Sequence, residues 1–225
     1  MQFTANDVPL PARLDALTVA GWTGRNEDTI RHHIEELAAL GVTPPSAVPL
    51  YYRVATDLLT FADAIQVVGE GTSGEVEPLL VTTGGRLYLG LASDHTDRDL
   101  ETHSVALSKQ ACAKPAAKTL WPFAEVEDHL EALELRSWIR ETPEAEWTLY
   151  QEGTLASIRP LDELIEASGL EAARAGGTTA AMLCGTLGAI GGVRPAAAFR
   201  MEMRDPVLDR TLSHGYQIET LPIVA

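Results

Sequence analysis

The stretch GEVEPLLVTTGGRLYLGLASDHTDRDLE, residues 74–101, carries the clearest fold signal in the chain. Its two β-prone runs, EVEPLLV and RLYLGLA, flank the glycine pair Gly84-Gly85. This arrangement is typical of antiparallel strands joined by a tight turn. The turn-rich segment from Gly69 to Gly74 separates EVEPLLV from an earlier β-prone run, IQVV. The sequence therefore predicts a series of short antiparallel strands in this region.

Outside that stretch, helical and strand-like patterns both occur. Ile30, Ile34 and Leu37 recur at helical spacing, which predicts an amphipathic helix. We place this helix from about Glu27 to Leu40, because Gly41 is suited to end it. Two further helices and a strand-like tail are expected at residues 124–135, 161–167 and 196–224. The fold class is therefore α+β, weighted toward β.

Size and charge limit the classes of partner. The length of 225 residues fits one compact core, which we divide into an N-terminal segment, residues 1–20, and a domain, residues 21–225. The net charge of -15 repels a phosphate backbone, so we expect no nucleic-acid partner. The same acidity repels an anionic substrate, which would need a local metal, lysine or arginine to bind.

The sequence contains no sign of export or membrane insertion. No apolar run approaches the roughly 18 residues that span a bilayer, and the N-terminus lacks the basic and apolar segments of a signal peptide. Cys112 and Cys184 form no C-x-x-C pair and are expected to be free thiols. We expect a cytoplasmic protein with no membrane partner.

Glu75 and Glu77 are the first candidates for chemistry. They are two residues apart in a strand-like run, so their side chains point to the same face of the strand. Two converging carboxylates require a shared proton or a cation between them. Oxygen-only ligands favour Mg²⁺, Mn²⁺ or Ca²⁺. The alternative, favoured by these two residues alone, is an exposed acidic strand edge.

A third carboxylate, Asp94, follows the run RLYLGLA within the polar segment SDHTDRDLE. If that run is a buried strand, Asp94 lies at its end, where a side chain can reach a pocket. The alternative is a solvated turn in which Asp94 caps a helix and Asp97 or Arg98 lies in its first turn.

His33 and Glu36 are three residues apart on the first predicted helix and share a face. His33 lies at the border of the apolar stripe, whereas His32 lies nearly opposite Ile30. A histidine oriented by a carboxylate can act as a general base. The alternative is an ordinary surface ion pair.

Three lysines, Lys109, Lys114 and Lys118, follow the acidic segment and could each place positive charge beside a developing anion. The glycine-rich segment LCGTLGAIGG lacks the Lys-Ser/Thr of a P-loop, and the chain has no G-x-S-x-G motif. Nucleotide binding and serine-hydrolase chemistry are therefore not supported.

The order of these features resembles the fumarylacetoacetate hydrolase superfamily from about Gly24 to the C-terminus. GRN, HHIEELAALG, the Pro44-Pro45 pair and PLYYR resemble the family's first motifs, which implies that His33 and Glu36 form a catalytic dyad. The family's fold implies a β-rich mixed β-roll or sandwich with a few flanking helices.

The central motifs imply the remaining site. GEVEPLLV and SDHTDRDLE resemble the family's Glu-x-Glu-Leu strand and its Asn-Asp-Val-Ser-x-Arg-Asp segment. By that match, Glu75, Glu77 and Asp94 are metal ligands, and Arg98 is either a structural residue or one that borders the site and binds substrate. The family's Ala-Lys motif resembles Ala113-Lys114, so Lys114 is preferred over the two other lysines.

Later segments, LYQEGTLASI, LDELI and CGTLG, resemble the family's last motifs, and they imply that Gly185 and Thr186 contact substrate oxygens. The chain also departs from the pattern. Glu27 stands where the family has tyrosine, Leu187 replaces a loop proline, and the short interval between Glu77 and Asp94 implies loss of a connecting helix.

The resemblance implies an enzyme that uses Mg²⁺ or Mn²⁺, with Ca²⁺ as an alternative, to act on a small keto or hydroxy acid through a metal-stabilised enolate. Hydrolysis, hydration, decarboxylation and isomerisation all fit. The alternatives are a metal-dependent small-molecule-binding protein or pseudoenzyme of the same fold, and a structural oligomerisation domain. We also expect a homodimer.

Overall fold

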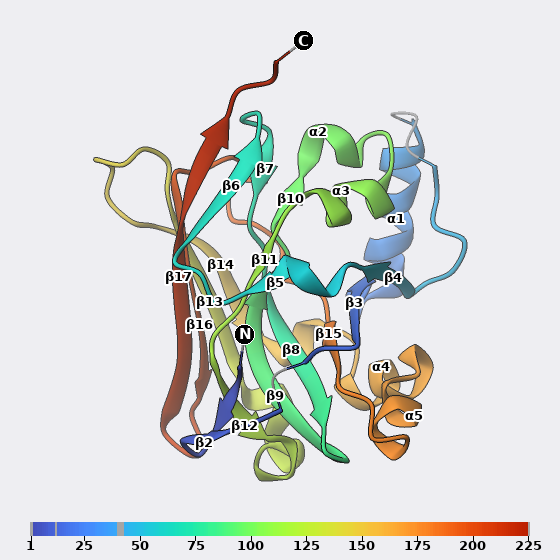
Figure 1. Cartoon of the computed structure of the whole chain (residues 1–225). Coiled ribbons are helices and arrows are strands. Elements are labelled where there is room, and N and C mark those ends of the chain that lie inside the picture. The colour runs from blue at the N-terminus through green and yellow to red at the C-terminus, as the bar shows by residue number, and fades with distance from the viewer. Residues whose placement is uncertain (1, 12, 40–42, 225) are drawn as a thin grey trace.

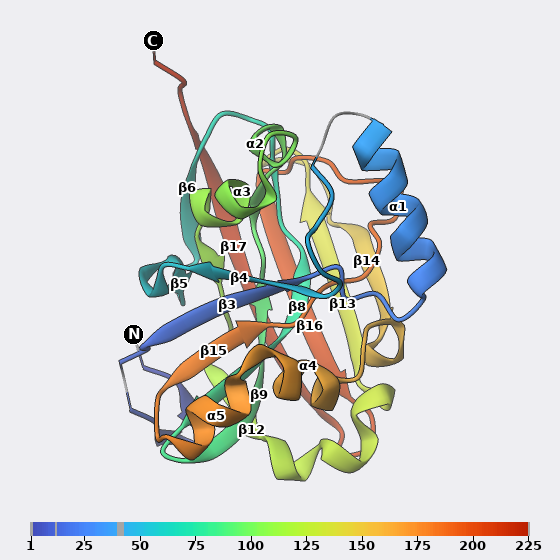
Figure 2. The same cartoon turned by 90° about the vertical axis from the view of Figure 1, so that its right-hand side faces the viewer.

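The chain is described by a computed structural model that covers residues 2–11, 13–39 and 43–224, without the side chains of His33, Glu36 and Leu37. Two large sheets form the body of this structure, and strands of one cross the other (Figures 1 and 2). Helices and short 3₁₀ turns lie at the ends and on the outer side.

The larger sheet has eight strands and is mixed. Their order is β2 (Val8–Pro9), β1 (Thr4–Ala5), β12 (Thr119–Pro122), β9 (Arg86–Ser93), β8 (Val76–Thr83), β15 (Ala180–Leu183), β3 (Ala16–Gly21) and β4 (Leu50–Val54). The central strands β8 and β9 pair antiparallel around Gly84 and Gly85, which both have positive φ. This confirms the predicted hairpin and joins the two strands directly, without a helix.

The second sheet has five strands, in the order β14 (Thr148–Thr154), β13 (Glu134–Arg140), β16 (Ala198–Asp205), β17 (Arg210–Leu221) and β6 (Ala64–Val68). The tail therefore forms strands, as predicted. β6 contains the run IQVV and was expected beside β8, but it pairs parallel with β17 at the edge of this sheet. Its alternating burial, with Ile65 and Val67 inside, suits an edge strand with one buried face.

The position of β8 in the core explains why its sequence is a nearly continuous apolar run. All its residues are buried, and its four branched apolar side chains divide between two clusters. Val76 and Leu80 pack in the cluster that includes the five-stranded sheet, whereas Leu79 and Val81 pack in a second cluster with the N-terminal strands. A strand covered on both faces loses the polar alternation of a half-buried strand. The expected domain boundary between residues 20 and 21 falls within β3.

The helices are α1 (Glu27–Ala39), α2 (Arg98–Glu101), α3 (Val105–Ala111), α4 (Leu161–Ser168) and α5 (Leu170–Ala175). α1 and α4 match two of the predicted helices. The helix predicted at residues 124–135 is wrong, because two 3₁₀ segments, Phe123–Glu125 and Glu127–Ala132, occupy this region and His129 has a non-helical backbone. Within the described residues, no helix is both long and apolar enough to cross a bilayer.

Two short ribbons hold the ends of the central hairpin. β7 (Thr72–Ser73) pairs with β10 (Thr96–Asp97), and β5 (Leu59–Thr60) pairs with β11 (Lys114–Pro115). They place the segments before β8 and after β9 beside one another, next to α2 and α3 (Figure 1).

Candidate metal centre

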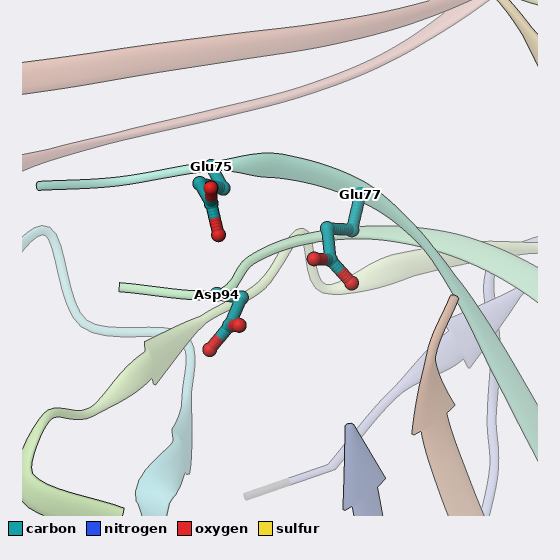
Figure 3. Close-up of side chains that lie close together, drawn as sticks. All are labelled: Glu75, Glu77 and Asp94. Atoms are coloured by element: carbon teal, nitrogen blue, oxygen red, sulfur yellow. The ribbon is translucent and has the colours of Figure 1, made fainter. Parts of the chain in front are cut away.

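Three carboxylates meet where the central hairpin opens. Glu75 immediately precedes β8, Glu77 lies in β8, and Asp94 immediately follows β9. The register pairs Glu77 with Ala92, and the Asp94 backbone N–H donates to the carbonyl oxygen of Glu75 at 3.0 Å. One carboxylate oxygen from each residue lies within 4.8 Å of the others, and the three side chains point toward a common space (Figure 3). We call these three residues the carboxylate cluster.

Burial excludes two of the alternatives left by the sequence. Glu77 is 2% exposed and Asp94 is fully buried, so they form neither an exposed acidic edge nor a solvated turn. The cap of α2 is Asp97, whose side chain accepts a hydrogen bond from the Leu100 N–H. The cluster is therefore part of the interior of the fold.

Two lysines face opposite oxygens of the Asp94 carboxylate. Lys109 Nζ lies 2.5 Å from Oδ2, and Lys114 Nζ lies 3.2 Å from Oδ1. Burial alone would raise the pKa of Asp94, but the two ammonium groups outweigh burial and lower the pKa to about 2. Asp94 is therefore ionised at neutral pH.

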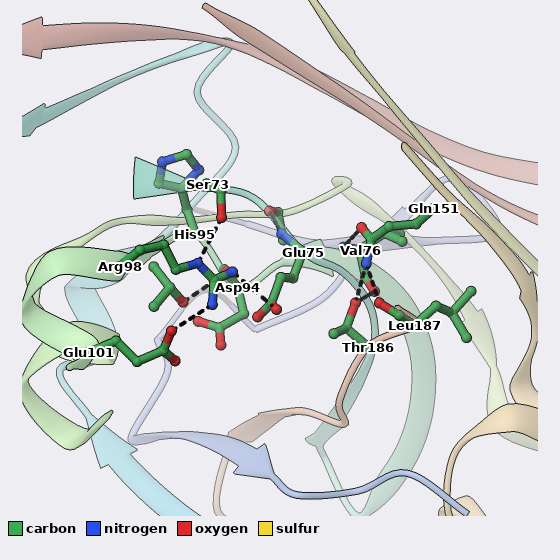
Figure 4. Close-up of polar contacts among 12 residues, drawn as sticks. Ser73, Glu75, Val76, Asp94, His95, Arg98, Glu101, Gln151, Thr186 and Leu187 are labelled. Atoms are coloured by element: carbon green, nitrogen blue, oxygen red, sulfur yellow. Dashed lines mark hydrogen bonds and ion pairs between the residues drawn. The ribbon is translucent and has the colours of Figure 1, made fainter. Parts of the chain in front are cut away.

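Arg98 borders the cluster on the side of α2 (Figure 4). Its guanidinium lies 3.0 Å from Glu75 Oε1 and 2.9 Å from Glu101 Oε2, and its Nε donates to Ser73 Oγ at 2.7 Å. Arg98 also lines the cavity beside the cluster, and its predicted role in substrate binding stays a prediction. Arg98, Lys109 and Lys114 thus form ion pairs with three carboxylates, those of Glu75, Asp94 and Glu101.

Glu77 is the carboxylate that these cations do not reach. Among the described residues, no ion pair within 4.0 Å includes Glu77, and its Oε2 accepts one backbone hydrogen bond, from Gly185 N–H at 2.8 Å. Burial raises the pKa of Glu77 well above its usual value, and Asp94 and Glu75 raise it further. A buried carboxylate beside two others is costly unless a cation compensates it.

The carboxylate cluster fits a hard divalent cation. In octahedral coordination at 2.0–2.1 Å, ligand atoms on opposite sides of Mg²⁺ are about 4 Å apart, and Ca²⁺ allows a slightly wider separation. The three ligand atoms are all oxygens within 4.8 Å of one another, a spacing that Ca²⁺ spans as it stands and that must close slightly around Mg²⁺. A cation placed there would also compensate Glu77, which forms no ion pair within 4.0 Å among the described residues. The assignment of these residues as metal ligands stays a prediction.

A cavity of about 760 Å³ opens onto the cluster. Its walls are largely apolar, and its charged end contains Glu75, Glu77, Arg98 and Lys109. A largely apolar pocket with a few convergent polar groups is typical of a site for a small molecule.

The loop after β15 contributes Gly185 and Thr186 to this cavity. Gly185 has φ +99°, and a Cβ there would lie 1.6 Å from Thr23 Oγ1, so the position requires glycine. Thr186 Oγ1 donates to the Val76 carbonyl oxygen at 2.8 Å. The loop is thereby fixed beside Glu77, and its predicted contact with substrate oxygens stays a prediction.

Gln151 of β14 holds that loop against β8 (Figure 4). Its Oε1 accepts from Val76 N–H at 3.0 Å, and its Nε2 donates to Thr186 Oγ1 and to the Leu187 carbonyl oxygen at 2.8 and 2.7 Å. The side chain is buried and links β8 to the loop after β15. Sequence reasoning noticed the glutamine within LYQEGT but gave it no function, because its partners are distant in the chain.

His95 follows Asp94 but is fully engaged in the interior. Its Nδ1 and Nε2 each lie 2.9 Å from a hydroxyl, those of Tyr216 and Thr72. Burial, together with Lys114 and Arg98, lowers the pKa of His95 to about 3, so its ring is neutral at physiological pH. His95 is therefore an anchor for the segment that carries Asp94.

The catalytic roles of His33, Glu36 and Lys114 stay predictions. The side chains of His33 and Glu36 lie outside the described residues, although Thr29 and Ile30 of the same helix line the cavity. Lys114 contacts Asp94 but is fully buried and does not line the described cavity. Lys109, which the family resemblance passed over, does line it. Lys109 and Val105 are four residues apart on α3 and both line the cavity. This spacing could have identified Lys109 only if the bounds of α3 had been known.

Structural comparisons agree with the predicted resemblance at the level of the fold. A fumarylacetoacetate isomerase/hydrolase from Oleispira antarctica has a TM-score of 0.61 at 16% identity, covering 97% of this chain and 99% of that one. A 2-keto-3-deoxyarabinonate dehydratase gives 0.64 at 17% identity over 97% and 79%. Fumarylacetoacetate hydrolase from Exiguobacterium antarcticum gives 0.57 at 17% identity over 96% and 77%.

Sequence comparisons identify the family. A search of curated proteins finds no match. The model of a family described as protein of unknown function (DUF2848) matches residues 20–216, which include every residue of the carboxylate cluster. The chain therefore belongs to the DUF2848 family, and it has the fold of the fumarylacetoacetate hydrolases.

Proposed function

We propose that the protein is a divalent-metal-dependent enzyme that acts on a small keto or hydroxy acid. The observation that carries this proposal is Glu77, a buried carboxylate beside two others that forms no ion pair within 4.0 Å among the described residues, and whose pKa stays raised despite the charge of Lys109. Such an arrangement is costly for the fold and useful for binding a cation. We expect Mg²⁺ or Mn²⁺, with Ca²⁺ as the alternative.

The substrate class is supported by charge and by the structural neighbours. Without an added ion, the three ion-paired carboxylates around Asp94 balance the three cations, so the site offers an acid no net positive charge. A divalent ion adds positive charge there and permits an anion to bind. Two neighbours are described as a hydrolase of fumarylacetoacetate and a dehydratase of 2-keto-3-deoxyarabinonate, and both names indicate small organic acids.

The residues of the chain take separable roles in this proposal. Glu75, Glu77 and Asp94 would hold the ion, which when bound supplies Lewis-acid stabilisation of negative charge. Lys114 acts through Asp94, because its ammonium is buried against that carboxylate. His33, oriented by Glu36, would activate a water in hydrolysis or hydration, or move a proton at the carbon beside the substrate carbonyl in decarboxylation or isomerisation.

A substrate panel tests the proposal directly. Purified protein, first treated with EDTA, would be assayed on 2-oxo acids and 1,3-dicarbonyl acids with Mg²⁺, with Mn²⁺, and without metal. We expect turnover of at least one acid that depends on the ion and is lost in Glu77→Ala. Turnover that persists in Glu77→Ala would contradict the assignment of the ion to this site.

A pair of neighbouring histidines tests the base. With an identified substrate, His33→Ala should lower turnover by roughly two to four orders of magnitude and leave metal affinity nearly unchanged. His32→Ala is the matched control and should have little effect. Full turnover in His33→Ala would reject the dyad.

The alternative is a metal-dependent small-molecule-binding protein of the same fold. The departures Glu27 and Leu187 favour it, because both lie in segments that the resemblance places near the pocket. Metal-dependent binding of an acid from the panel, without turnover in any assay, would identify this case. The homodimer, the cytoplasmic location and the lack of nucleic-acid and membrane partners stay predictions.

A further inference from the structure

Two lysines contact the same carboxylate, but they are held in different ways. Besides Asp94, Lys114 Nζ donates to the carbonyl oxygens of His95 at 2.7 Å and Cys112 at 3.0 Å. The Lys114 side chain is fully buried. Because two backbone groups also depend on it, Lys114 is a fixed part of the interior.

Lys109 has only carboxylates among its described partners. Its Nζ lies 2.5 Å from Asp94 Oδ2, 3.8 Å from Glu75 Oε2 and 4.0 Å from Glu101 Oε1. Lys109 also lines the cavity, and so does Glu101. The ammonium therefore sits at the boundary between the carboxylate cluster and the open space, on the short helix α3.

Two of the partners of Lys109 are also two of the three expected metal ligands. An ion bound to Asp94 and Glu75 would lie 2.0–2.6 Å from their oxygens. The Lys109 ammonium contacts the same two side chains, so a divalent ion and Lys109 would repel each other at short range in a buried site. Lys109 has space to move into the cavity, where Glu101 offers a second acceptor, whereas Lys114 is enclosed.

We propose that Lys109 is a tethered cation that competes with the divalent ion for the carboxylate cluster. Without the ion, Lys109 neutralises Asp94 and Glu75. When the ion binds, Lys109 moves from Asp94 toward the cavity and presents its ammonium to the carboxylate of the substrate. This inference rests on the proposed function, because it takes the cluster as a metal site.

The exchange couples the ion to the substrate. One cation enters the cluster as another is moved into the cavity, so binding of the ion strengthens binding of an anionic ligand. Because coupling of binding is reciprocal, an anionic ligand in the cavity would strengthen binding of the ion by the same factor. Lys114 takes no part, since its backbone acceptors hold it in place.

Calorimetric titration of the EDTA-treated full-length protein with Mn²⁺ tests the competition. Lys109→Met keeps the length of the side chain and removes its charge, so we expect the Kd for Mn²⁺ to fall by about tenfold or more. Lys118→Met is the matched control, because it makes the same substitution at an exposed lysine, and it should bind Mn²⁺ as the wild type does. An unchanged or weaker affinity in Lys109→Met would overturn the competition.

This titration also separates failure of the inference from failure of the proposed function. Equal Mn²⁺ affinity in wild type and Lys109→Met, abolished by Glu77→Gln, overturns the role of Lys109 and keeps the metal site. Lack of Mn²⁺ binding by both proteins overturns the metal site and the inference together.

Lysine acetylation of the wild-type protein tests the movement without a variant that must fold. Acetic anhydride would be added with and without saturating Mn²⁺, and the modified lysines quantified by mass spectrometry. We expect Mn²⁺ to raise the acetylation of Lys109 several-fold, to leave Lys114 protected and to leave Lys118 unchanged. Acetylation of Lys109 that is unchanged or lowered by Mn²⁺ would overturn the proposal.

Discussion

Two buried carboxylates, those of Glu77 and Asp205, have different surroundings in this fold. Asp205, at the end of β16, is fully buried like its counterpart Glu77. The groups that contact its oxygens at 3.0–3.2 Å are two backbone N–H groups and two side chains, from Val207, Leu208, His129 and Arg210. Burial alone would raise the pKa of Asp205, but these contacts outweigh it and lower the pKa.

Glu77 receives one backbone N–H, from Gly185, and has two carboxylates as neighbours. Its pKa is raised by burial and by those neighbours. The chain can therefore satisfy a buried carboxylate and does so at Asp205. At Glu77 it does not, and this is the difference that the proposed ion would remove.

The largest expected effect on the free energy of unfolding concerns Asp94. This buried carboxylate differs from both Asp205 and Glu77, because a lysine faces each of its oxygens. Lys114→Met leaves Asp94 with one lysine and leaves two buried carbonyl groups without their donor. Breaking a buried ion pair in this way should lower the free energy of unfolding by about 3–5 kcal/mol. Urea unfolding measures this loss, with Lys118→Met as the exposed control. A loss below about 1 kcal/mol would contradict the fixed role of Lys114.

The second effect is the stabilisation of the folded protein by the divalent ion that we propose for the carboxylate cluster. An ion that binds the folded state alone stabilises it by about 2.7 kcal/mol at a hundredfold excess over Kd. We expect Mg²⁺ to stabilise the wild type and Asp205→Asn by the same amount, and Glu77→Gln not at all. Thermal unfolding at matched ionic strength, with Na⁺ replacing Mg²⁺ in the control, measures the difference. Equal stabilisation of all three proteins would show that the ion binds elsewhere.

The third effect belongs to Asp205, where an amide keeps the shape and removes the charge. Hydrogen bonds to a charged group are worth more than neutral ones, so Asp205→Asn should lose about 2 kcal/mol at neutral pH. Since the folded pKa of Asp205 is lowered, its contribution is complete above the unfolded pKa and is lost as the pH falls through the folded pKa. The gap between wild type and variant should therefore shrink below about pH 4. A gap independent of pH would contradict this account.

The sequence predicted the hairpin and the three carboxylates because both depend on local spacing. Gly84-Gly85 fixes the turn, and a strand places Glu75 and Glu77 on one face. The motif order of the family then supplied Asp94. These predictions needed no knowledge of distant contacts, and the structure brings the three residues together.

The family motifs named Arg98 and Lys114, but the contact of Lys109 with the cluster could not be predicted in the same way. Lys109 reaches Asp94 because α2 and α3 pack beside β10, and the bounds of such short helices do not follow from periodicity. Gln151 reaches Val76 and Leu187 across the two sheets. The pairing of β6 with β17 is equally distant in sequence, since the register of an edge strand depends on its partner.

The smallest effect is also the sharpest contrast, because the same change of carboxylate to amide should have opposite signs at the two sites. In the absence of divalent ions, Glu77→Gln removes a buried negative charge from beside Asp94 and Glu75 and keeps an oxygen for the Gly185 N–H. The variant should match the wild type or gain up to about 1 kcal/mol in the free energy of unfolding. Urea unfolding with EDTA measures this change, with Glu144→Gln at an exposed position as the control. A loss as large as that of Asp205→Asn would mean that Glu77 is satisfied within the fold, and the argument for a missing cation would fail.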